Sequence, residues 1–159
     1  MYRSGIGYDT HRFAEGRKLM LGGVEVPHVR GLEGHSDADV LTHAIADALL
    51  GAIGERDIGH HFPNTEEAIR GISSLAILQT VGEILAEKKC RIVNVDATLI
   101  AEAPKIGPHL EAMRGKISAV LGIDVLRVGI KATTNEGMGA LGRGEGMAAL
   151  AVASVEQSE

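Results

Sequence analysis

The chain has 159 residues, the length of one domain, and a chain of this size buries roughly 70% of the surface that its unfolded form exposes. Its net charge of -5 excludes the broad basic surface of a nucleic-acid-binding protein. No apolar run approaches the roughly 18 residues of a membrane span, and the single cysteine, Cys90, has no partner for a disulfide within the chain. We therefore expect one cytoplasmic domain over residues 1–159, with neither nucleic acid nor membrane as a partner.

The N-terminal part of the chain predicts strands. Residues 3–9 have the pattern of a strand, and residues 18–26 predict a hairpin whose turn is formed by Gly22 and Gly23. Aromatic residues make up only 3% of the chain, whereas there are 21 glycines, so close packing of backbones is expected.

A helix is predicted over residues 40–53. Ser36 is its expected N-cap, and Asp39 three residues later takes the place of the acidic partner in a capping box. Helical spacing puts Asp39, His43 and Asp47 in one polar stripe, opposite the apolar side of the helix. His43 is therefore expected to face away from the apolar stripe.

The rest of the chain predicts two more helices and three more strands. Its expected elements are a helix over 74–88, a strand over 91–101, a helix over 108–121 with Gly122 as its stop, and strands over 126–133 and 146–155. In the first of these strands one side carries Val93, Val95, Ala97 and Leu99. The glycine-dense stretch 137–146 is expected to be a loop, because its glycine spacing is not that of a dinucleotide-binding turn.

This order of elements predicts an α+β fold with a mixed sheet and helices packed on one of its faces. The strand expected over 146–155 is apolar on both sides, so the second face of the sheet must also be covered. A partner subunit is a candidate for that cover.

The pattern Asp9-Thr10-His11 predicts a metal site when it is combined with His43. Residues two apart on a strand point to the same side, so Asp9 and His11 can present an oxygen and a nitrogen to one ion. Three such ligands leave a fourth tetrahedral position free, as in catalytic zinc sites. Asp39 and Asp47 are candidates to orient the imidazole of His43. The alternative for the Asp-x-His pair is a solvated surface or a capping contact.

Two further polar groups have both a functional and an ordinary interpretation. His35 and Ser36 precede the helix over 40–53, where unpaired N–H groups favour an anion, but N-capping explains the same residues. A second set fits either a polyanion surface or common turn chemistry: Lys105, Thr133, Thr134 and Glu136.

Over essentially its whole length the sequence resembles the 2-C-methyl-D-erythritol 2,4-cyclodiphosphate synthase family of the non-mevalonate isoprenoid pathway. The segments that carry this resemblance are Gly5-Ile6-Gly7-Tyr8-Asp9-Thr10-His11, His35-Ser36-Asp37-Ala38-Asp39-Val40, His43-Ala44, Asp47-Ala48, Asp57-Ile58-Gly59, Phe62-Pro63, Ala101-Glu102-Ala103-Pro104-Lys105, Lys131-Ala132-Thr133-Thr134 and Gly142-Arg143-Gly144-Glu145-Gly146.

The resemblance implies one Zn²⁺ per subunit on Asp9, His11 and His43, and a second cation, Mg²⁺ or Mn²⁺, that bridges the substrate phosphates. It assigns transition-state stabilisation to His35 and Thr134. It further implies contacts to the methylerythritol part by Ser36, Asp57, Ile58 and Gly59. Phe62 and Asn64 are also implied to bind substrate, and the Asn64 side chain can hydrogen-bond a hydroxyl. The cytidine and its phosphates would be held by Ala101, Ala103, Pro104, Lys105, Thr133, Thr134 and Glu136, partly from a neighbouring subunit of a homotrimer.

Three positions depart from the family pattern. Asn64 stands where an Asp is usual, Asn135 replaces a Thr, and Ala140 replaces a Phe near the trimer axis. There the resemblance implies that Arg143 meets an isoprenoid diphosphate.

The implied reaction converts 4-diphosphocytidyl-2-C-methyl-D-erythritol 2-phosphate into 2-C-methyl-D-erythritol 2,4-cyclodiphosphate and CMP. The substrate's own phosphate is the nucleophile, so no activated Ser or Cys is needed. Two rival functions fit the same residues: a zinc phosphohydrolase, in which water attacks, and a non-catalytic trimer that binds isoprenoid diphosphate.

Overall fold

The computed structural model describes residues 1–63, 65, 67 and 70–158. Its strands are β1 (Tyr2–Ala14), β2 (Leu19–Leu21), β3 (Val24–Val26), β4 (Gly31–Leu32), β5 (Cys90–Ile100), β6 (Val128–Thr133) and β7 (Gly146–Gln157). Five of them form a sheet of order β4-β1-β7-β5-β6, in which only β5 and β6 are parallel neighbours. The remaining two, β2 and β3, pair as the hairpin that the Gly22-Gly23 turn predicted.

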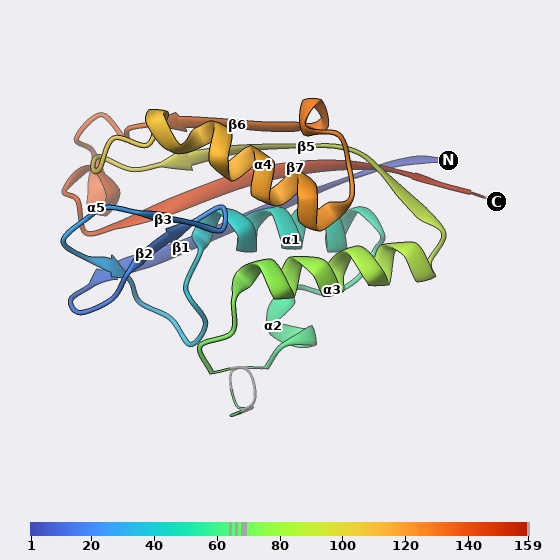
Figure 1. Cartoon of the computed structure of the whole chain (residues 1–159), viewed down its shortest axis with the longest axis horizontal. Helices are drawn as coiled ribbons and strands as arrows, with labels where there is room; N and C mark the ends of the chain where they lie inside the picture. The colour runs from blue at the N-terminus through green and yellow to red at the C-terminus, as the bar shows by residue number, and fades with distance from the viewer. Residues whose placement is uncertain (64, 66, 68–69, 159) are drawn as a thin grey trace.

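The helices are α1 (Val40–Ala52), α2 (Ile58–His61), α3 (Ser74–Glu87), α4 (Leu110–Leu121) and α5 (Gly139–Gly142), with 3-10 turns η2 (Gly107–His109) and η3 (Val125–Arg127). The helix α1 lies against β1 and β7, α4 lies against β6, and α3 packs between them. Figure 1 shows these helices beside the long strands, with both termini at one end of the molecule. The predicted α+β class is confirmed. No helix among the described residues has the length and apolar character that a bilayer crossing requires.

Two glycines of β1 allow α1 to approach the sheet closely. A Cβ at Gly7 would lie 1.9 Å from the carbonyl oxygen of Ala44, and a Cβ at Gly5 would lie 2.1 Å from that of Ala48. These distances are far below van der Waals contact, so only glycine fits. The glycine-rich composition therefore serves the contact that brings α1 over β1.

The start of α1 differs from the prediction. Asp39, not Ser36, is the N-cap, and its carboxylate accepts a hydrogen bond from the Thr42 amide. Ala38 has a φ of 55°, so the chain from Ser36 to Asp39 is not helical. The Asp39 carboxylate also accepts hydrogen bonds from the amides of Gly22 and Gly23. It therefore occupies the helix N-terminus that the sequence offered as an anion site.

Two other predictions are corrected in the second half of the chain. An irregularity of the pairing between Ile92 and Asn94 shifts the alternation of β5, so Ile92 is buried and Val93 is only partly so. The glycine-dense stretch contains the single helical turn α5 within the expected loop.

The sheet face away from the helices is open in the single chain. Ile6 pairs with Val152 and Tyr8 pairs with Leu150, and paired residues of neighbouring strands share a face. The large exposed apolar residues there are Ile6, Tyr8, Leu150 and Val152. A contiguous apolar patch of this kind is typical of an interaction surface.

Candidate metal centre and active site

Three side chains from two elements meet where α1 crosses β1. Gly5, Gly7, Asp9 and His11 alternate onto the helix-facing side of the strand, because successive side chains of a strand point to opposite faces. His43 reaches them from α1 and is only 7% exposed. From the predicted polar stripe of the helix, His43 therefore faces this buried meeting point and not solvent.

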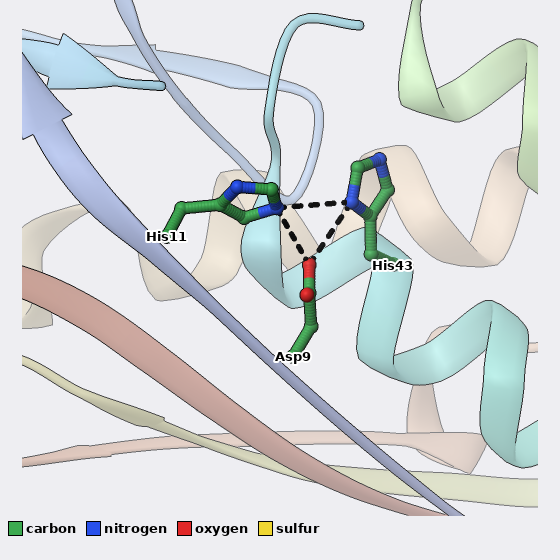
Figure 2. A group of neighbouring side chains, drawn as sticks. All are labelled: Asp9, His11 and His43. Atoms are coloured by element: carbon green, nitrogen blue, oxygen red, sulfur yellow. Dashed lines mark hydrogen bonds and ion pairs between the residues drawn. The ribbon is translucent and has the colours of Figure 1, made fainter. Parts of the chain in front are cut away.

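The ligand atoms form a small triangle. His11 Nε2 lies 2.8 Å and His43 Nδ1 lies 3.0 Å from the same carboxylate oxygen, Oδ2 of Asp9, and the two nitrogens are 3.4 Å apart (Figure 2). A tetrahedral ion with bonds of about 2.0–2.1 Å places its ligands about 3.3 Å apart. Only small shifts of these side chains would admit a divalent metal ion, and their atoms are of the right chemical kind.

The electrostatics of the triangle favour a cation at its centre. Burial raises the pKa of Asp9, but hydrogen bonds from His11 and His43 and their charge outweigh it and lower the pKa to about 2. For His11, burial lowers the pKa, yet the hydrogen bond to Asp9 and the charge of that carboxylate raise it above the usual value of 6.5. In the metal-free chain, protons on imidazole thus compete with a metal ion for the same carboxylate.

The outer nitrogens of the two imidazoles have different partners. Nδ1 of His11 donates to the backbone carbonyl of Glu33 at 2.7 Å, so in the neutral imidazole the unprotonated nitrogen is Nε2, which faces Asp9. Nε2 of His43 lies 2.8 Å from Oγ of Ser74 and 3.2 Å from Oγ of Ser36.

The prediction that Asp39 and Asp47 orient His43 is wrong. Asp39 is fully buried, burial raises its pKa, and it binds the β2–β3 turn and Thr42. The carboxylate of Asp47 accepts from the backbone amide of Ile58 at 2.8 Å, and so fixes the start of α2. Sequence reasoning missed Ser74, whose contact with His43 spans 31 residues and has no local signal.

A cavity of about 210 Å³ opens beside the triangle. Its described lining contains many of the residues predicted for the methylerythritol part and the phosphates: Asp9, His11, His35, Ser36, His43, Ile58, Gly59 and Phe62. Asp57 is the N-cap of α2 next to this wall. Asn64, predicted in the same group, lies outside the described residues.

The residues predicted to hold cytidine lie elsewhere in the chain. Thr133 of β6 pairs with Ile100, which is in register with Ala148 and then with Thr10 of β1. Three strand spacings separate Thr133 from Thr10, about 14 Å. The described lining of the cavity includes neither the β6 end nor the segment after β5 that carries Ala101, Ala103, Pro104 and Lys105.

Those two segments do meet each other. The amide of Ala101 donates to the carbonyl of Thr133 at 2.9 Å, and a carboxylate oxygen of Glu102 accepts from the amides of Asn135 and Gly137. Sequence reasoning did not assign this role to Glu102. Thr134, Glu136 and Lys105 are exposed on the surface that results.

The departures from the family pattern fall in structured places. Asn135 donates from its side-chain amide to the carbonyl of Met138, which stabilises the turn before α5. Ala140 lines a second hollow together with Thr10 and Leu141. Arg143 is exposed and donates to Glu145 at 2.7 Å.

The fold and the site together define a metal-binding enzyme of the α+β class. The sheet has one face covered by helices, a carboxylate and two imidazoles lie within reach of one divalent ion, and a cavity opens beside them. Comparison with known proteins gives the family. Residues 2–156 match the YgbB family, and the chain belongs to it.

Curated relatives carry the name 2-C-methyl-D-erythritol 2,4-cyclodiphosphate synthase. The chain is 62% identical to the one from Alkaliphilus metalliredigens over 98% of both chains, and 56% identical to the one from Chlorobium phaeobacteroides over 98% of both. The chain is thus an enzyme of this kind, acting in isoprenoid biosynthesis.

Solved structures agree in fold. The bifunctional IspDF of Campylobacter jejuni is 36% identical with a TM-score of 0.96. The match covers 100% of this chain and 43% of that longer protein. The IspF of Plasmodium falciparum in complex with CDP is 32% identical with a TM-score of 0.86, covering 99% of this chain and 97% of that one.

Proposed function

We propose that the chain cyclises 4-diphosphocytidyl-2-C-methyl-D-erythritol 2-phosphate to 2-C-methyl-D-erythritol 2,4-cyclodiphosphate, with release of CMP, in the cytoplasm. The observation that carries this proposal is the triangle of Asp9, His11 and His43 at the wall of a cavity that also holds His35 and Ser36. Zn²⁺ is the proposed ion, because one carboxylate and two imidazoles leave its fourth position open.

The reaction needs positioning and charge neutralisation more than a protein nucleophile. An oxygen of the 2-phosphate forms a bond to the β-phosphorus, the bond from that phosphorus to the bridging oxygen breaks, and CMP leaves with the electron pair. Well-oriented intramolecular reactions reach effective molarities of about 10⁵–10⁸ M. The zinc ion, when bound, supplies positive charge to the crowded phosphate oxygens.

The chain's own residues divide this work. His35 and Ser36 lie in the cavity wall beside the triangle, where they can donate to a phosphate, while Ile58, Gly59 and Phe62 form the wall from α2 onward. The backbone of α2 is held in place by Asp47 and capped by Asp57. We assign this cavity to the methylerythritol phosphate part of the substrate.

The nucleotide end needs a second surface. The cavity of about 210 Å³ is smaller than the roughly 300–1,000 Å³ usual for a ligand pocket, so it accommodates only part of a nucleotide-linked substrate. Lys105, Thr133 and Thr134 lie on a different edge of the same chain. We therefore propose a homotrimer in which a neighbouring subunit brings these residues to the cavity, with Thr134 stabilising the transition state.

Two further ligands belong to this proposal. A second cation, Mg²⁺ or Mn²⁺, would bridge phosphates that carry more negative charge than one zinc ion balances. The exposed guanidinium of Arg143, next to the hollow that Ala140 lines, is the proposed contact for an isoprenoid diphosphate at the trimer axis.

Product analysis tests the reaction. The purified chain, with zinc quantified by elemental analysis, is incubated with the cytidine-linked substrate, and phosphorus NMR follows the products. We expect CMP and the cyclic diphosphate in equal amounts. An open-chain diphosphate would instead identify a zinc phosphohydrolase, and no turnover with retained isoprenoid diphosphate binding would identify a binding protein.

The variant His43→Ala tests the metal site. We expect both zinc content and CMP release to fall, the latter by at least about 100-fold, because loss of a direct ligand exceeds the effect of losing an outer partner. The control is His28→Ala, since His28 packs on Phe13 and is not among the described cavity residues. Full turnover by His43→Ala would refute the ligand set.

A further inference from the structure

The imidazole of His43 is connected to a buried serine and a carboxylate behind it. Ser74, the first residue of α3, is fully buried, and its Oγ lies 2.8 Å from His43 Nε2. The same hydroxyl donates to Oδ1 of Asp37, and the Ser74 amide donates to Oδ2 of Asp37 at 3.0 Å. Figure 2 shows that the outer nitrogen of His43, Nε2, points away from Asp9 and His11. This is the nitrogen that the Ser74 hydroxyl contacts.

The donor of each hydrogen bond in this network follows from the chemistry of the Asp37 carboxylate, the Ser74 hydroxyl and the His43 imidazole. An ionised carboxylate only accepts, so the single hydroxyl proton of Ser74 is used toward Asp37. The Ser74 oxygen can then only accept from His43, and Nε2 must carry the proton. A neutral imidazole protonated at Nε2 has its lone pair on Nδ1, the atom that faces Asp9 and His11.

We propose that Asp37 and Ser74 are positioning residues that hold His43 in the tautomer and orientation required for metal binding. The inference rests on the proposed metal site of Asp9, His11 and His43. It gives His43 the counterpart of the Glu33 carbonyl, which holds His11 in its own metal-ready tautomer.

The same contacts connect the metal centre to the cavity walls. Asp37 lies next to Ser36, and its amide donates to the carbonyl of Ile72, while the Gly71 amide donates to the carbonyl of His35. Ser36 and Ile72 both line the cavity. The position of the loop before α1 is thereby tied to the start of α3 and to the metal ligand.

Two substitutions separate this role from a general effect on folding. Ser74→Ala removes the nearer of the two hydroxyls at His43 Nε2 and leaves only the longer contact with Ser36 at 3.2 Å. Asp37→Asn keeps the volume but changes the donors: an amide NH₂ directed at Ser74 Oγ makes that hydroxyl donate to His43, which puts the imidazole proton on Nδ1. In the opposite orientation, the NH₂ of Asn would face the Ser74 amide, so two hydrogen-bond donors would point at each other. Both orientations therefore disturb the network.

The matched control is Ser73→Ala. Ser73 is the exposed N-cap of α3 and accepts from the Leu75 amide, so its loss weakens the helix start without touching His43. A variant that acts only through α3 would behave like this control.

The experiment measures Zn²⁺ affinity of the full-length variants by competition with a chromophoric chelator at neutral pH, after circular dichroism has shown that each is folded. We expect Ser74→Ala and Asp37→Asn to bind zinc about 10- to 100-fold more weakly, and Ser73→Ala to bind it as the unsubstituted chain does. In the zinc-loaded unsubstituted chain, ¹H–¹⁵N spectra should show His43 protonated at Nε2.

Each alternative outcome has its own meaning. Unchanged zinc affinity in both Ser74→Ala and Asp37→Asn, with loss of zinc in His43→Ala, overturns the positioning role and leaves the proposed function intact. Protonation of zinc-bound His43 at Nδ1 also overturns it. Zinc binding that survives His43→Ala refutes the ligand set itself.

Discussion

The two imidazoles of the metal centre face Asp9 with different ring nitrogens. His11 presents Nε2 from a strand, and His43 presents Nδ1 from a helix. Each outer nitrogen meets an oxygen, the Glu33 carbonyl for His11 and the Ser74 hydroxyl for His43. Two imidazole nitrogens that are already held in place lower the conformational entropy lost when they bind a metal ion.

Zinc should stabilise the chain less in mild acid than in mild base. The pKa of His11 is raised above 6.5, so in mild acid the imidazole of the metal-free chain carries a second proton, on Nε2. This proton must leave before Nε2 can bind metal. The protonated His11–Asp9 pair stabilises the metal-free fold below about pH 6.5, and this contribution is lost as pH rises through the higher folded pKa. Asp9 remains ionised across this range, since its pKa is about 2.

Thermal unfolding with and without Zn²⁺, at about pH 6 and about pH 8, tests this expectation. The increase of Tm on adding zinc should be smaller at the lower pH. An equal increase at both values would contradict the role of a histidine proton in the competition.

At the scale of elements, the decisive contact is that of α1 with β1. The strand supplies Asp9 and His11, the helix supplies His43, and the glycines before Asp9 set the distance between the two. The alternation of the strand puts Gly7 and Asp9 on one face, so the closest packing and the metal ligands are adjacent.

Gly7→Ala should therefore destabilise the fold by about 1–3 kcal/mol or more, since its Cβ would meet the backbone of α1 and not a flexible side chain. It should also reduce zinc affinity, because α1 must move away from β1. Urea unfolding and chelator competition measure the two effects. Wild-type stability and zinc affinity in this variant would contradict the close-contact argument.

Gly115→Ala is the matched substitution in α4. This glycine is exposed in the middle of a helix, and a Cβ there would have nothing within 4 Å. We expect it to raise stability by about 1 kcal/mol through helix propensity and to leave zinc binding unchanged.

At the scale of the whole molecule, the proposed homotrimer would account for both the open sheet face and the proposed division of the substrate site. The apolar residues of β1 and β7 on that face are solvent-exposed in one chain, with Ile6 68% exposed and Val152 46% exposed. Thr133, in one of the segments proposed to hold the nucleotide, lies three strand spacings, about 14 Å, from Thr10 between Asp9 and His11. Assembly of copies would cover the face and complete the site together.

Ile6→Glu tests this proposal, because it places a charge in the middle of the apolar patch. We expect light scattering to show a smaller assembly and CMP release to fall sharply, while zinc affinity is retained, since Asp9, His11 and His43 belong to one chain. The control is Leu126→Glu, at an apolar residue of η3 that is 84% exposed. A fully active monomer would exclude the shared site.

Local patterns in the sequence were sufficient for most elements. The helix over 74–88 is confirmed as α3, and the Gly122 stop is confirmed with a φ of 64°. The alternation of Asp9 and His11 was equally visible, since the period of a strand is a local property. Their meeting with His43 was predicted from residue chemistry and from a resemblance to a known family, and the structure brings the three together.

The tertiary structure decided which polar residues support these ligands. Asp39 has the spacing of a partner for His43 but is used for capping and for the β2–β3 turn, whereas Ser74, 31 residues away, contacts the imidazole. The sequence by itself determined the ligand types and the elements that carry them, because both depend on neighbours along the chain. Partners separated by a whole loop are determined only by packing, which no local period encodes.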